Sequence, residues 1–382
     1  MRAVQFYAAG DVRVEDVPVP QASDDRVLIE VEWCGICGSD LNEYMFGPFA
    51  IPSPQSGPHP LTNAMRPVTM GHEFTGRIQY VPESISHLKK GQAVVVDPRY
   101  YCSSCTPCLQ NATNSCEMIG FVGLSGGGGG LSEFVAVRPE AVHVLSWNGS
   151  ADVDLAAAAL IEPLAVAWHA LGLFLSISPC QTTHKDDADL STIPILVIGA
   201  GPVGVAMCYV LRARGAKTIY VSEVSQARRE TLHGMNIVAK VFDSGQIDVP
   251  KEVRMLTGDG VGVVFDCAGS QAGFDAGCQS LRFKGVYINL AVPKGPMTLP
   301  LAPFMWKEVI YKSSLAYNQD DFKDVVNAFL AGRFQGVEKM ITNRLSLEDI
   351  VEKGFKELIK PNSHIKILDT PKRESIKRGV AV

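Results

Sequence analysis

Neither a broad excess of basic charge nor a long uninterrupted apolar run is present in this 382-residue sequence. Thirty-five Lys and Arg residues are balanced by 40 Asp and Glu residues, and the formal net charge at pH 7 is −5. Because nucleic acids and anionic lipids attract a cationic surface, this balance predicts neither as a partner. The ordinary share of apolar residues, 46%, also excludes an intrinsically disordered chain and a small disulfide-dependent scaffold.

The sequence also shows no sign of secretion or of a membrane span. The first ten residues lack the apolar core of a secretory signal. The two most apolar stretches are 155–175, which contains Glu162 and Pro163, and 193–211, which is interrupted near its middle by a Gly-Ala-Gly-Pro turn. We therefore expect a cytoplasmic protein whose ten cysteines are thiols or metal ligands rather than disulfides.

The chain is long enough for two domains, and its patterning changes near residue 155. Before that point, short β-branched or alternating runs separated by Gly and Pro predict a β-rich domain. From residue 193 onward, apolar strands alternate with helical segments, which is typical of a doubly wound parallel sheet. The expected strands are 27–33, 75–80, 92–96 and 133–137 in the first part and 195–198, 218–222, 261–266 and 286–290 in the second, with helices at 203–214, 226–235 and 271–281.

The last part of the chain mixes both patterns. Residues 320–331 and 347–358 are predicted to be helical, and residues 364–368 to form a final strand. The polar segment 181–192 is predicted to be a solvated loop. The one low-complexity run, Gly126–Gly130, favours a flexible turn over an anion site.

Four cysteines lie close together on one short segment: Cys102, Cys105, Cys108 and Cys116, with the spacing C-x2-C-x2-C-x7-C. Four thiolates on such a loop can surround a Zn²⁺ ion and leave no coordination position for a substrate. The spacing therefore predicts a structural zinc site. Metal binding there would contribute on the order of 10 kcal/mol to ordering the loop.

A second set of metal-binding residue types is spread along the chain. Cys37 lies in a Cys-Gly-Ile-Cys-Gly-Ser-Asp stretch, His72 in Gly-His-Glu, and Glu162 within an apolar segment. Ligands of an open catalytic zinc are often far apart in sequence, and a buried acid is costly unless it is paired or bound to a metal. A His beside a Glu also fits an ordinary polar pair, and Glu162 also fits a surface position at a helix end.

A dinucleotide fingerprint, Gly199-Ala-Gly-Pro-Val-Gly204, follows an apolar strand and opens an apolar helix. Gly199 permits a tight turn, Gly201 lets the backbone approach a pyrophosphate, and Gly204 allows close packing of helix on strand. Pro202 and Val203, which begin the helix, are also expected to contact the cofactor.

Glu223 ends the next strand, and its carboxylate can accept hydrogen bonds from both ribose hydroxyls. Because the same charge would repel a 2′-phosphate, Glu223 favours NAD over NADP. Arg228, further along, is expected either over the adenine or as a solvated helix charge.

These stretches together resemble the zinc-containing medium-chain dehydrogenases over essentially the whole chain. The residues that carry the resemblance are 34–40, 71–73, the four-cysteine loop, Glu-Pro-Leu-Ala-Val-Ala-Trp-His at 162–169 and the fingerprint; 47–48, 58–62 and 123–130 are similar to the (R,R)-butanediol dehydrogenase branch, a neighbour of the sorbitol dehydrogenases. The resemblance implies an α/β protein with a GroES-like β-rich catalytic domain, residues 1–170 and 316–382, and a Rossmann domain, residues 171–315.

The resemblance also implies roles for individual residues. Cys37 and His72 would bind a catalytic zinc. Glu162 would bind it directly or through water, and Glu73 would exchange with or support the ligands. Ser39 matches the first proton acceptor of the family. The expected cofactors are one catalytic and one structural zinc per chain, together with NAD.

One position departs from the family pattern. The family commonly has a histidine where this sequence has Asn42, and an asparagine cannot accept a proton. Water, or another group such as His59, would then complete the proton relay.

The activity implied is hydride transfer between NAD and a secondary alcohol, a vicinal diol or hydroxyketone such as butanediol or acetoin. A polyol or secondary-metabolite alcohol dehydrogenase is the nearest alternative, and a non-redox lyase or aldolase on the same scaffold is an alternative of another class. The resemblance further implies a homodimer or homotetramer in which strands around 286–290 and 313–316 pair across a twofold axis.

Overall fold

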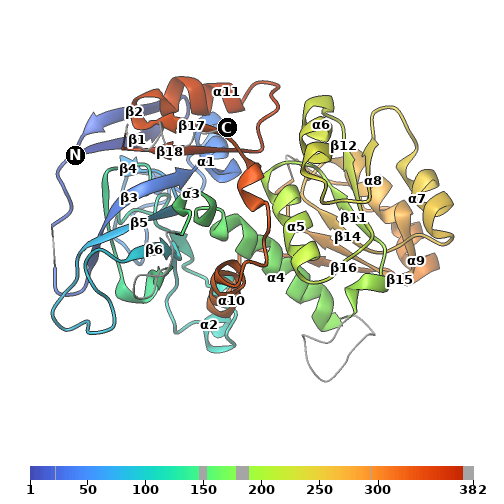
Figure 1. Ribbon diagram of the computed structural model, residues 1–382, viewed down its shortest axis with the longest axis horizontal. Helices are drawn as coiled ribbons and strands as arrows, with labels where there is room; N and C mark the ends of the chain where they lie inside the picture. The colour runs from blue at the N-terminus through green and yellow to red at the C-terminus, as the bar shows by residue number, and fades with distance from the viewer. Residues whose placement is uncertain (22, 146–152, 178–188, 294, 373–382) are drawn as a thin grey trace. The chain divides into compact units, whose positions relative to one another are not determined.

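The computed structural model describes residues 1–21, 23–145, 153–177, 189–293 and 295–372 (Figure 1). It divides the chain into two compact units. Unit 1 comprises Met1–Glu162, Asn318–Ala331 and Ile341–Val382, and unit 2 comprises Pro163–Tyr317 and Gly332–Met340. The predicted loop at 181–192 lies mostly outside the described residues; its last three residues, Leu190–Thr192, form a 3-10 turn.

Unit 1 is built mainly from antiparallel strands. The strands of its seven-stranded sheet run in the order β10 (Val142–Val144), β6 (Ala93–Val96), β5 (Glu73–Tyr80), β3 (Val27–Gly35), β18 (Lys366–Thr370) and β17 (Ile341–Ser346), with β9 (Phe134–Val137) also paired to β3. A second sheet has the order β2 (Asp11–Asp16), β1 (Arg2–Ala8) and β4 (Val68–Thr69), and β7 (Arg99–Tyr100) pairs with β8 (Gly120–Phe121).

The register around β3 brings distant segments together. Val27, Ile29 and Val31 alternate into the core, as half-buried strands do. At the end of the strand, Gly35 pairs with Glu73 of β5 on one side and with Leu368 of β18 on the other. The first turn of α1 (Gly38–Phe46) follows directly, so three sequence regions meet at one point.

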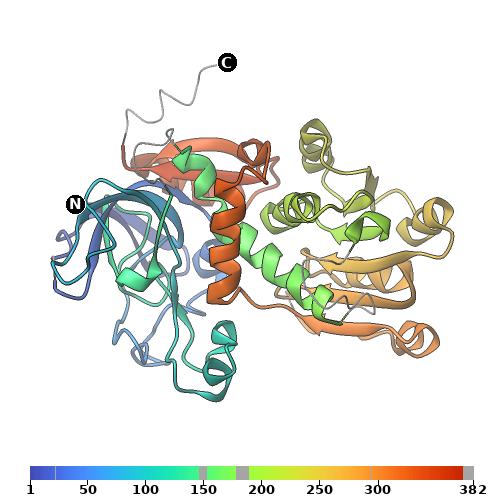
Figure 2. The ribbon, with the colours of Figure 1, turned by 60° about the horizontal axis from the view of Figure 1, so that its bottom comes forward.

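The helices of unit 1 are short apart from α10. Besides α1 they are α2 (Thr106–Leu109), α3 (Leu155–Ala158), α10 (Gln319–Leu330) and α11 (Lys356–Leu358), and α10 is the upright orange-red helix of Figure 2. Residues 347–358 are helical, as predicted, but they do not form one regular helix: the segment consists of a 3-10 turn, a π-helical turn over Ile350–Phe355 and α11. Ile350 and Phe355 are both fully buried, and a π-turn brings residues five apart onto one face.

Unit 2 is a six-stranded parallel sheet with helices packed around it (Figure 1). The strand order is β13 (Lys240–Asp243), β12 (Ile219–Glu223), β11 (Ile195–Ile198), β14 (Val261–Asp266), β15 (Leu281–Asn289) and β16 (Ile310–Ser313). The helices are α4 (Ile161–Ile177), α5 (Pro202–Ala213), α6 (Gln226–Met235), α7 (Val249–Thr257), α8 (Gln271–Ser280) and α9 (Leu301–Lys307). All four residues of β11 are buried, as a strand covered on both faces requires.

The division along the chain differs from the expected boundaries at 170/171 and 315/316. Most of α4 and the segment Gly332–Met340 belong to unit 2. The ring of Trp168 on α4 lies edge-on to Phe334 and beneath the guanidinium of Arg214. The Tyr209 hydroxyl donates a 2.5 Å hydrogen bond to the carbonyl oxygen of Gly336. These contacts hold both segments to the parallel-sheet unit.

The predicted strands and the other predicted helices are present with shifts of a few residues at their ends, except that β15 begins five residues earlier than expected. Its first residues include the charged Arg282 and Lys284, which are not typical of a buried strand. Within the described residues, no helix is both long and apolar enough to cross a membrane.

A buried hydrogen bond between adjacent strands of unit 2 gives a first prediction. The Tyr287 hydroxyl donates to Asp266 Oδ2 at 2.8 Å, and both side chains are buried. In Tyr287→Phe this carboxylate oxygen loses its donor, which should lower the free energy of unfolding by about 1.5–3 kcal/mol. Urea unfolding measures the change. The control is Tyr311→Phe, because that ring stacks on Tyr287 but is 44% exposed; equal stabilities of the two variants would contradict the account.

Candidate functional site

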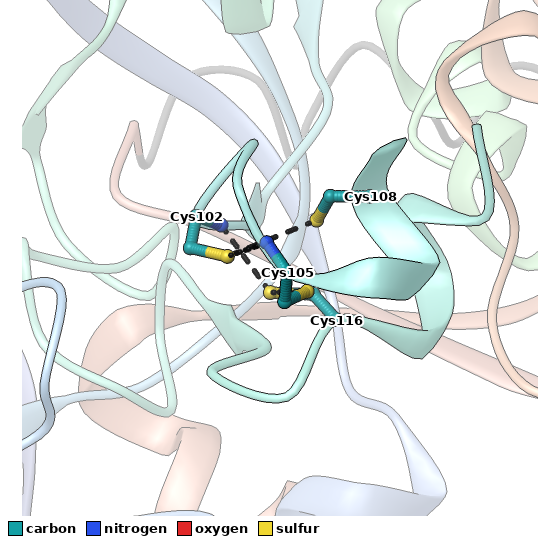
Figure 3. Close-up of side chains that lie close together, drawn as sticks. All are labelled: Cys102, Cys105, Cys108 and Cys116. Carbon is teal, nitrogen blue, oxygen red and sulfur yellow. Dashed lines mark hydrogen bonds between the residues drawn. The ribbon is translucent and has the colours of Figure 1, made fainter. Parts of the chain in front are cut away.

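The four predicted cysteines come together on one loop (Figure 3). Their sulfur atoms all lie within 4.8 Å of one another, with 4.0 Å between Cys102 and Cys108 and 3.9 Å between Cys105 and Cys116. A tetrahedral zinc with Zn–S bonds of about 2.3 Å requires sulfur separations of about 3.8 Å. The arrangement therefore fits a closed four-thiolate zinc site.

Local hydrogen bonds prepare this loop for thiolates. Hydrogen bonds from Ser104 and from the backbone N–H of Cys105 lower the pKa of Cys102 to about 5. The Cys116 sulfur accepts from the backbone N–H groups of Cys102 and Met118. These donors stabilise negative charge on sulfur, but burial outweighs them at Cys116, whose pKa is raised, and burial also raises the pKa of Cys108 to about 12. Hydrogen bonds alone therefore favour the thiolate at Cys102, and a bound cation would be needed to favour it at Cys108 and Cys116.

A buried arginine that was not among the predicted site residues anchors the loop. The side chain of Arg99 is fully buried and pairs with Asp97 at 2.5 Å. Its Nη1 donates to Thr113 Oγ1 at 3.0 Å, which ties the start of the loop to the turn before Cys116. The only signal in the sequence is that Asp97 and Arg99, two residues of opposite charge, stand two positions apart shortly before the first cysteine.

The second set of ligands also converges, within unit 1. Ligand atoms of Cys37, His72 and Glu73 all lie within 4.8 Å of one another. Cys37 precedes the first turn of α1, and Glu73 is the first residue of β5. His72 follows Gly71, which has a φ of +97°. A Cβ at position 71 would lie 2.6 Å from the Leu131 backbone nitrogen, so only glycine fits there. The tight turn at 71 is therefore what presents the imidazole.

Asp40 orients Cys37 and His72, two of the candidate ligands. This fully buried carboxylate accepts a 2.9 Å hydrogen bond from the Cys37 backbone N–H, and its other oxygen lies 3.5 Å from His72 Nδ1. Burial lowers the pKa of His72, but Asp40 and Cys37 more than offset this and raise it well above its ordinary value. The remaining ring nitrogen, Nε2, lies 3.1 Å from Ser39 Oγ. Asp40 was not among the predicted site residues, although a Cys-x-x-Asp spacing at a helix start is compatible with a capping box.

A buried ion pair lies behind these ligands. Lys366 Nζ of β18 donates to both carboxylate oxygens of Glu73, at 2.8 and 2.6 Å, and to the Ile36 carbonyl oxygen at 3.1 Å. Both charged side chains are 1% exposed. A Cβ at Gly35 would lie 2.2 Å from Glu73 Oε2, so glycine is needed there to make room for the carboxylate. Lys366 was missed because its role depends on the pairing of β18 with β3.

Glu162 stands slightly apart from the other predicted ligands. Its side chain is buried, but it is not within the 4.8 Å set formed by Cys37, His72 and Glu73. Burial lowers the pKa of Lys366, but the charges of Glu73 and Cys37 raise it above its ordinary value. The charge of Glu162 makes a smaller contribution in the same direction. Glu162 therefore lies close enough to act electrostatically on the same buried region.

The dinucleotide fingerprint forms the predicted strand, turn and helix in unit 2. Gly199, with a φ of +94°, directly follows β11, and a Cβ at Gly204 would lie 1.9 Å from the Gly199 oxygen. Only glycine therefore permits this approach of α5 to the strand. Gly201 caps α5, and Pro202 and Val203 occupy its first turn.

Glu223 lies against this loop. One of its carboxylate oxygens accepts from the Ala200 N–H at 2.7 Å and the other from the Ser225 N–H at 2.8 Å. The guanidinium of Arg228 faces Gly201, with Nη1 3.8 Å from a Cβ built there. Its Nε is buried and has no hydrogen-bond partner in the described part of the chain, so a donor is left over beside a turn suited to anions.

The two residues considered for the end of a proton relay lie in different settings. Asn42 is exposed on α1. The ring of His59 lies beside Gly120, and its Nε2 is 3.4 Å from the Ile119 carbonyl oxygen. No hydrogen bond joins Asn42 and His59 among the described residues.

Two family models match this chain: "Alcohol dehydrogenase GroES-like domain" at residues 23–146 and "Zinc-binding dehydrogenase" at residues 202–331. The (R,R)-butanediol dehydrogenase of Neisseria gonorrhoeae is 36% identical and that of Saccharomyces cerevisiae 34%, over 97% of this chain and 99% and 98% of theirs. D-xylulose reductase A of Aspergillus oryzae is 28% identical over 94% of this chain and 93% of its own. The crystal structure of 2R,3R-butanediol dehydrogenase from Bacillus subtilis superposes with a TM-score of 0.84 at 34% identity, covering 97% of this chain and 99% of that one.

The buried pair gives the prediction for this site. In Lys366→Met the Glu73 carboxylate is left buried without its cation, which should destabilise the protein by about 3–5 kcal/mol. Adding Glu73→Gln should restore part of that loss, because no unpaired charge then remains. Urea unfolding of the single and double variants measures the coupling.

The matched control is the exposed pair Lys356 and Glu352. Lys356→Met should change the free energy of unfolding by less than about 1 kcal/mol. If Lys366→Met were no more destabilising than this control, the buried pair would not hold the site together.

Proposed function

The chain belongs to the zinc-binding dehydrogenases with an alcohol dehydrogenase GroES-like domain, as its sequence resemblance predicted, and we propose that it transfers hydride between a vicinal diol or hydroxyketone and NAD. Membership establishes a zinc-dependent alcohol oxidoreductase that uses a nicotinamide cofactor. The observation that carries the proposal is the convergence of Cys37, His72 and Glu73 in front of Lys366.

We propose two zinc ions per chain. The four cysteines of the loop would hold one, and the donor set and sulfur spacing support a structural role. Cys37 and His72 would hold the other, with Glu162 completing the set directly or through a water molecule. Glu73 is tied by both oxygens to Lys366, so we place it as a supporting carboxylate that can exchange with Glu162. When bound, zinc acts as a Lewis acid that favours loss of a proton from an alcohol.

Asp40 would then orient His72, and Ser39 would accept the proton. Asp40 faces His72 Nδ1 and leaves Nε2 directed toward the Ser39 hydroxyl. Ser39 Oγ is thus placed to take a proton where a substrate oxygen would lie. Asn42 does not titrate, so we propose that water carries the proton onward from Ser39.

Replacing Ser39 tests this role. Ser39→Ala should lower kcat by about 10²-fold or more, the effect typical of losing a positioned proton acceptor, and should change the pH profile of kcat. Ser39→Thr keeps a hydroxyl and should retain most of the rate. An alanine variant with unchanged kcat and pH profile would contradict the role proposed for Ser39.

We propose NAD as the coenzyme because a carboxylate stands where a 2′-phosphate would bind. Glu223 ends β12 beside the fingerprint, and its two oxygens are already oriented by backbone N–H groups. The glycines at 199, 201 and 204 would admit the pyrophosphate, and Arg228 offers a charged donor beside Gly201.

The ratio of kcat/KM for NAD to that for NADP tests this proposal. Glu223→Gln removes the charge and should lower the ratio by at least about tenfold, because a charge-assisted hydrogen bond to the ribose is lost. Glu230→Gln is the control, since Glu230 is an exposed residue of the neighbouring helix. A wild-type preference for NADP would overturn the assignment.

The proposed substrate class rests on the relatives named for butanediol, which match this chain along almost its full length. A polyol dehydrogenase is the second candidate, supported by the more distant relative named D-xylulose reductase A. We expect NADH to form faster with butane-2,3-diol than with xylitol when kcat/KM is compared. The reverse order would favour the polyol activity, and turnover without net change in NADH would favour a non-redox reaction.

We further propose a cytoplasmic homodimer or homotetramer. All nine cysteines in the described residues are free thiols, which suits a reducing compartment. Among the described residues no strand pairs with the outer edge of β16, and Ile310 and Tyr311 on it are 44% exposed. Such an edge is a liability unless another chain covers it. Sedimentation at the mass of a single 41.2 kDa chain would contradict an oligomer.

A further inference from the structure

A hollow in unit 1 shares no residue with the metal clusters or the fingerprint. Its volume is about 430 Å³, within the range of small-molecule pockets. The walls come from β7, the loop at 61–62, the glycine run and the segment around β9. Two arginines and two tyrosines, Arg26, Arg138, Tyr100 and Tyr101, supply its chemistry.

The two arginines of the hollow have few carboxylates near them. Arg138 lies over the rings of Tyr100 and Tyr101, at 5.3 and 5.7 Å, and its Nη2 donates to the Arg99 carbonyl oxygen at 3.1 Å. In the parts of the chain that the structure describes, no carboxylate pairs with Arg138. Among the described residues, the carboxylate paired with Arg26 is that of Asp25, at 3.4 Å, whose side chain is 76% exposed, and the Arg26 side chain also acts on the Tyr100 hydroxyl. A solvated carboxylate of this kind neutralises little of the charge.

A hydroxyl donor is also left over at the same place. Tyr100 is 6% exposed, and its hydroxyl has no hydrogen-bond partner among the described residues. Burial raises the pKa of Tyr100 although the charges of Arg26 and Arg138 act to lower it, so the phenol keeps its proton as a donor. A buried donor without a partner costs free energy unless a ligand or water satisfies it.

The glycine run shapes the wall around this hydroxyl. Gly126, Gly127 and Gly128 all have positive φ, between 76° and 90°. A Cβ at Gly127 would lie 2.1 Å from the Tyr100 hydroxyl oxygen. The glycine run was predicted only as a turn. It also forms the wall of the hollow, because only glycine at 127 leaves room beside the Tyr100 hydroxyl.

We propose that this hollow is a binding site for a small organic anion with a carboxylate or phosphate group. Arg138 and Arg26 would bind the oxyanion, since guanidinium groups match carboxylate and phosphate geometry. The Tyr100 hydroxyl would donate a further hydrogen bond. The tyrosine rings give the rest of the ligand an apolar surface, which favours an organic anion over a bare inorganic ion.

Calorimetric titration of the zinc-loaded full chain tests the site with three probes: benzoate, phenyl phosphate and inorganic phosphate. Saturable binding of benzoate or phenyl phosphate with a Kd of about 1 mM or tighter is expected. Preference for one of them identifies the group recognised. Binding of inorganic phosphate as tightly as phenyl phosphate would contradict the organic part of the proposal.

Variants separate this hollow from any other site that takes the probes. Arg138→Gln and Tyr100→Phe should each weaken binding at least about tenfold, the effect of losing a strong hydrogen bond, with alcohol oxidation unchanged. Tyr101→Phe is the control, because the Tyr101 hydroxyl bonds to Gln319 instead. If Arg138→Gln does not fold, Arg26→Gln takes its place. Absent binding, or binding that Arg138→Gln and Tyr100→Phe leave unaltered, would overturn the proposal.

Discussion

A single buried ammonium group constrains the proposed catalytic centre. Lys366 reaches the region from β18, close to the end of the described chain, and is held by Glu73 and by the Ile36 carbonyl oxygen. Two charges removed from water are tolerable only while they remain paired and hydrogen-bonded. Because Glu73 directly follows His72, and Ile36 directly precedes Cys37, the pair fixes the spacing of two proposed ligands on separate strands and loops.

The two clusters of unit 1 bring potential metal-binding atoms together in different ways. The four-cysteine loop is local: its ligands lie on one segment, receive backbone hydrogen bonds from that segment and are anchored by Arg99 beside it. The cluster of Cys37, His72 and Glu73 is assembled by strand register and by the close approach of Gly35 to Glu73. A closed site needs only a loop, whereas an open one needs a rigid frame that keeps a position free.

This difference also explains what the sequence could reveal. The cysteine spacing and the strand, glycine turn and helix around 199–204 are local patterns, and they predicted the sulfur cluster and the strand–turn–helix that the structure has there. Asp40 and Arg99 carry only weak local signals, a capping-box spacing and an acid two residues away, and Lys366 carries none. Their partners His72, Thr113 and Glu73 reach them only when the chain folds. The same holds for the π-turn at 350–355, where burial of Phe355 prevails over the regular helical period. The fold class followed from periodicity and resemblance, while the extent of unit 2 depended on contacts such as that of Trp168 with Phe334.

Metal analysis of the wild-type protein and of Cys37→Ser tests most directly whether the frame around Lys366 holds a zinc ion. We expect about two zinc ions per wild-type chain, and one in a Cys37→Ser chain that is folded but inactive. A folded Cys37→Ser protein that retained both ions, or a wild-type protein fully active with one, would contradict it.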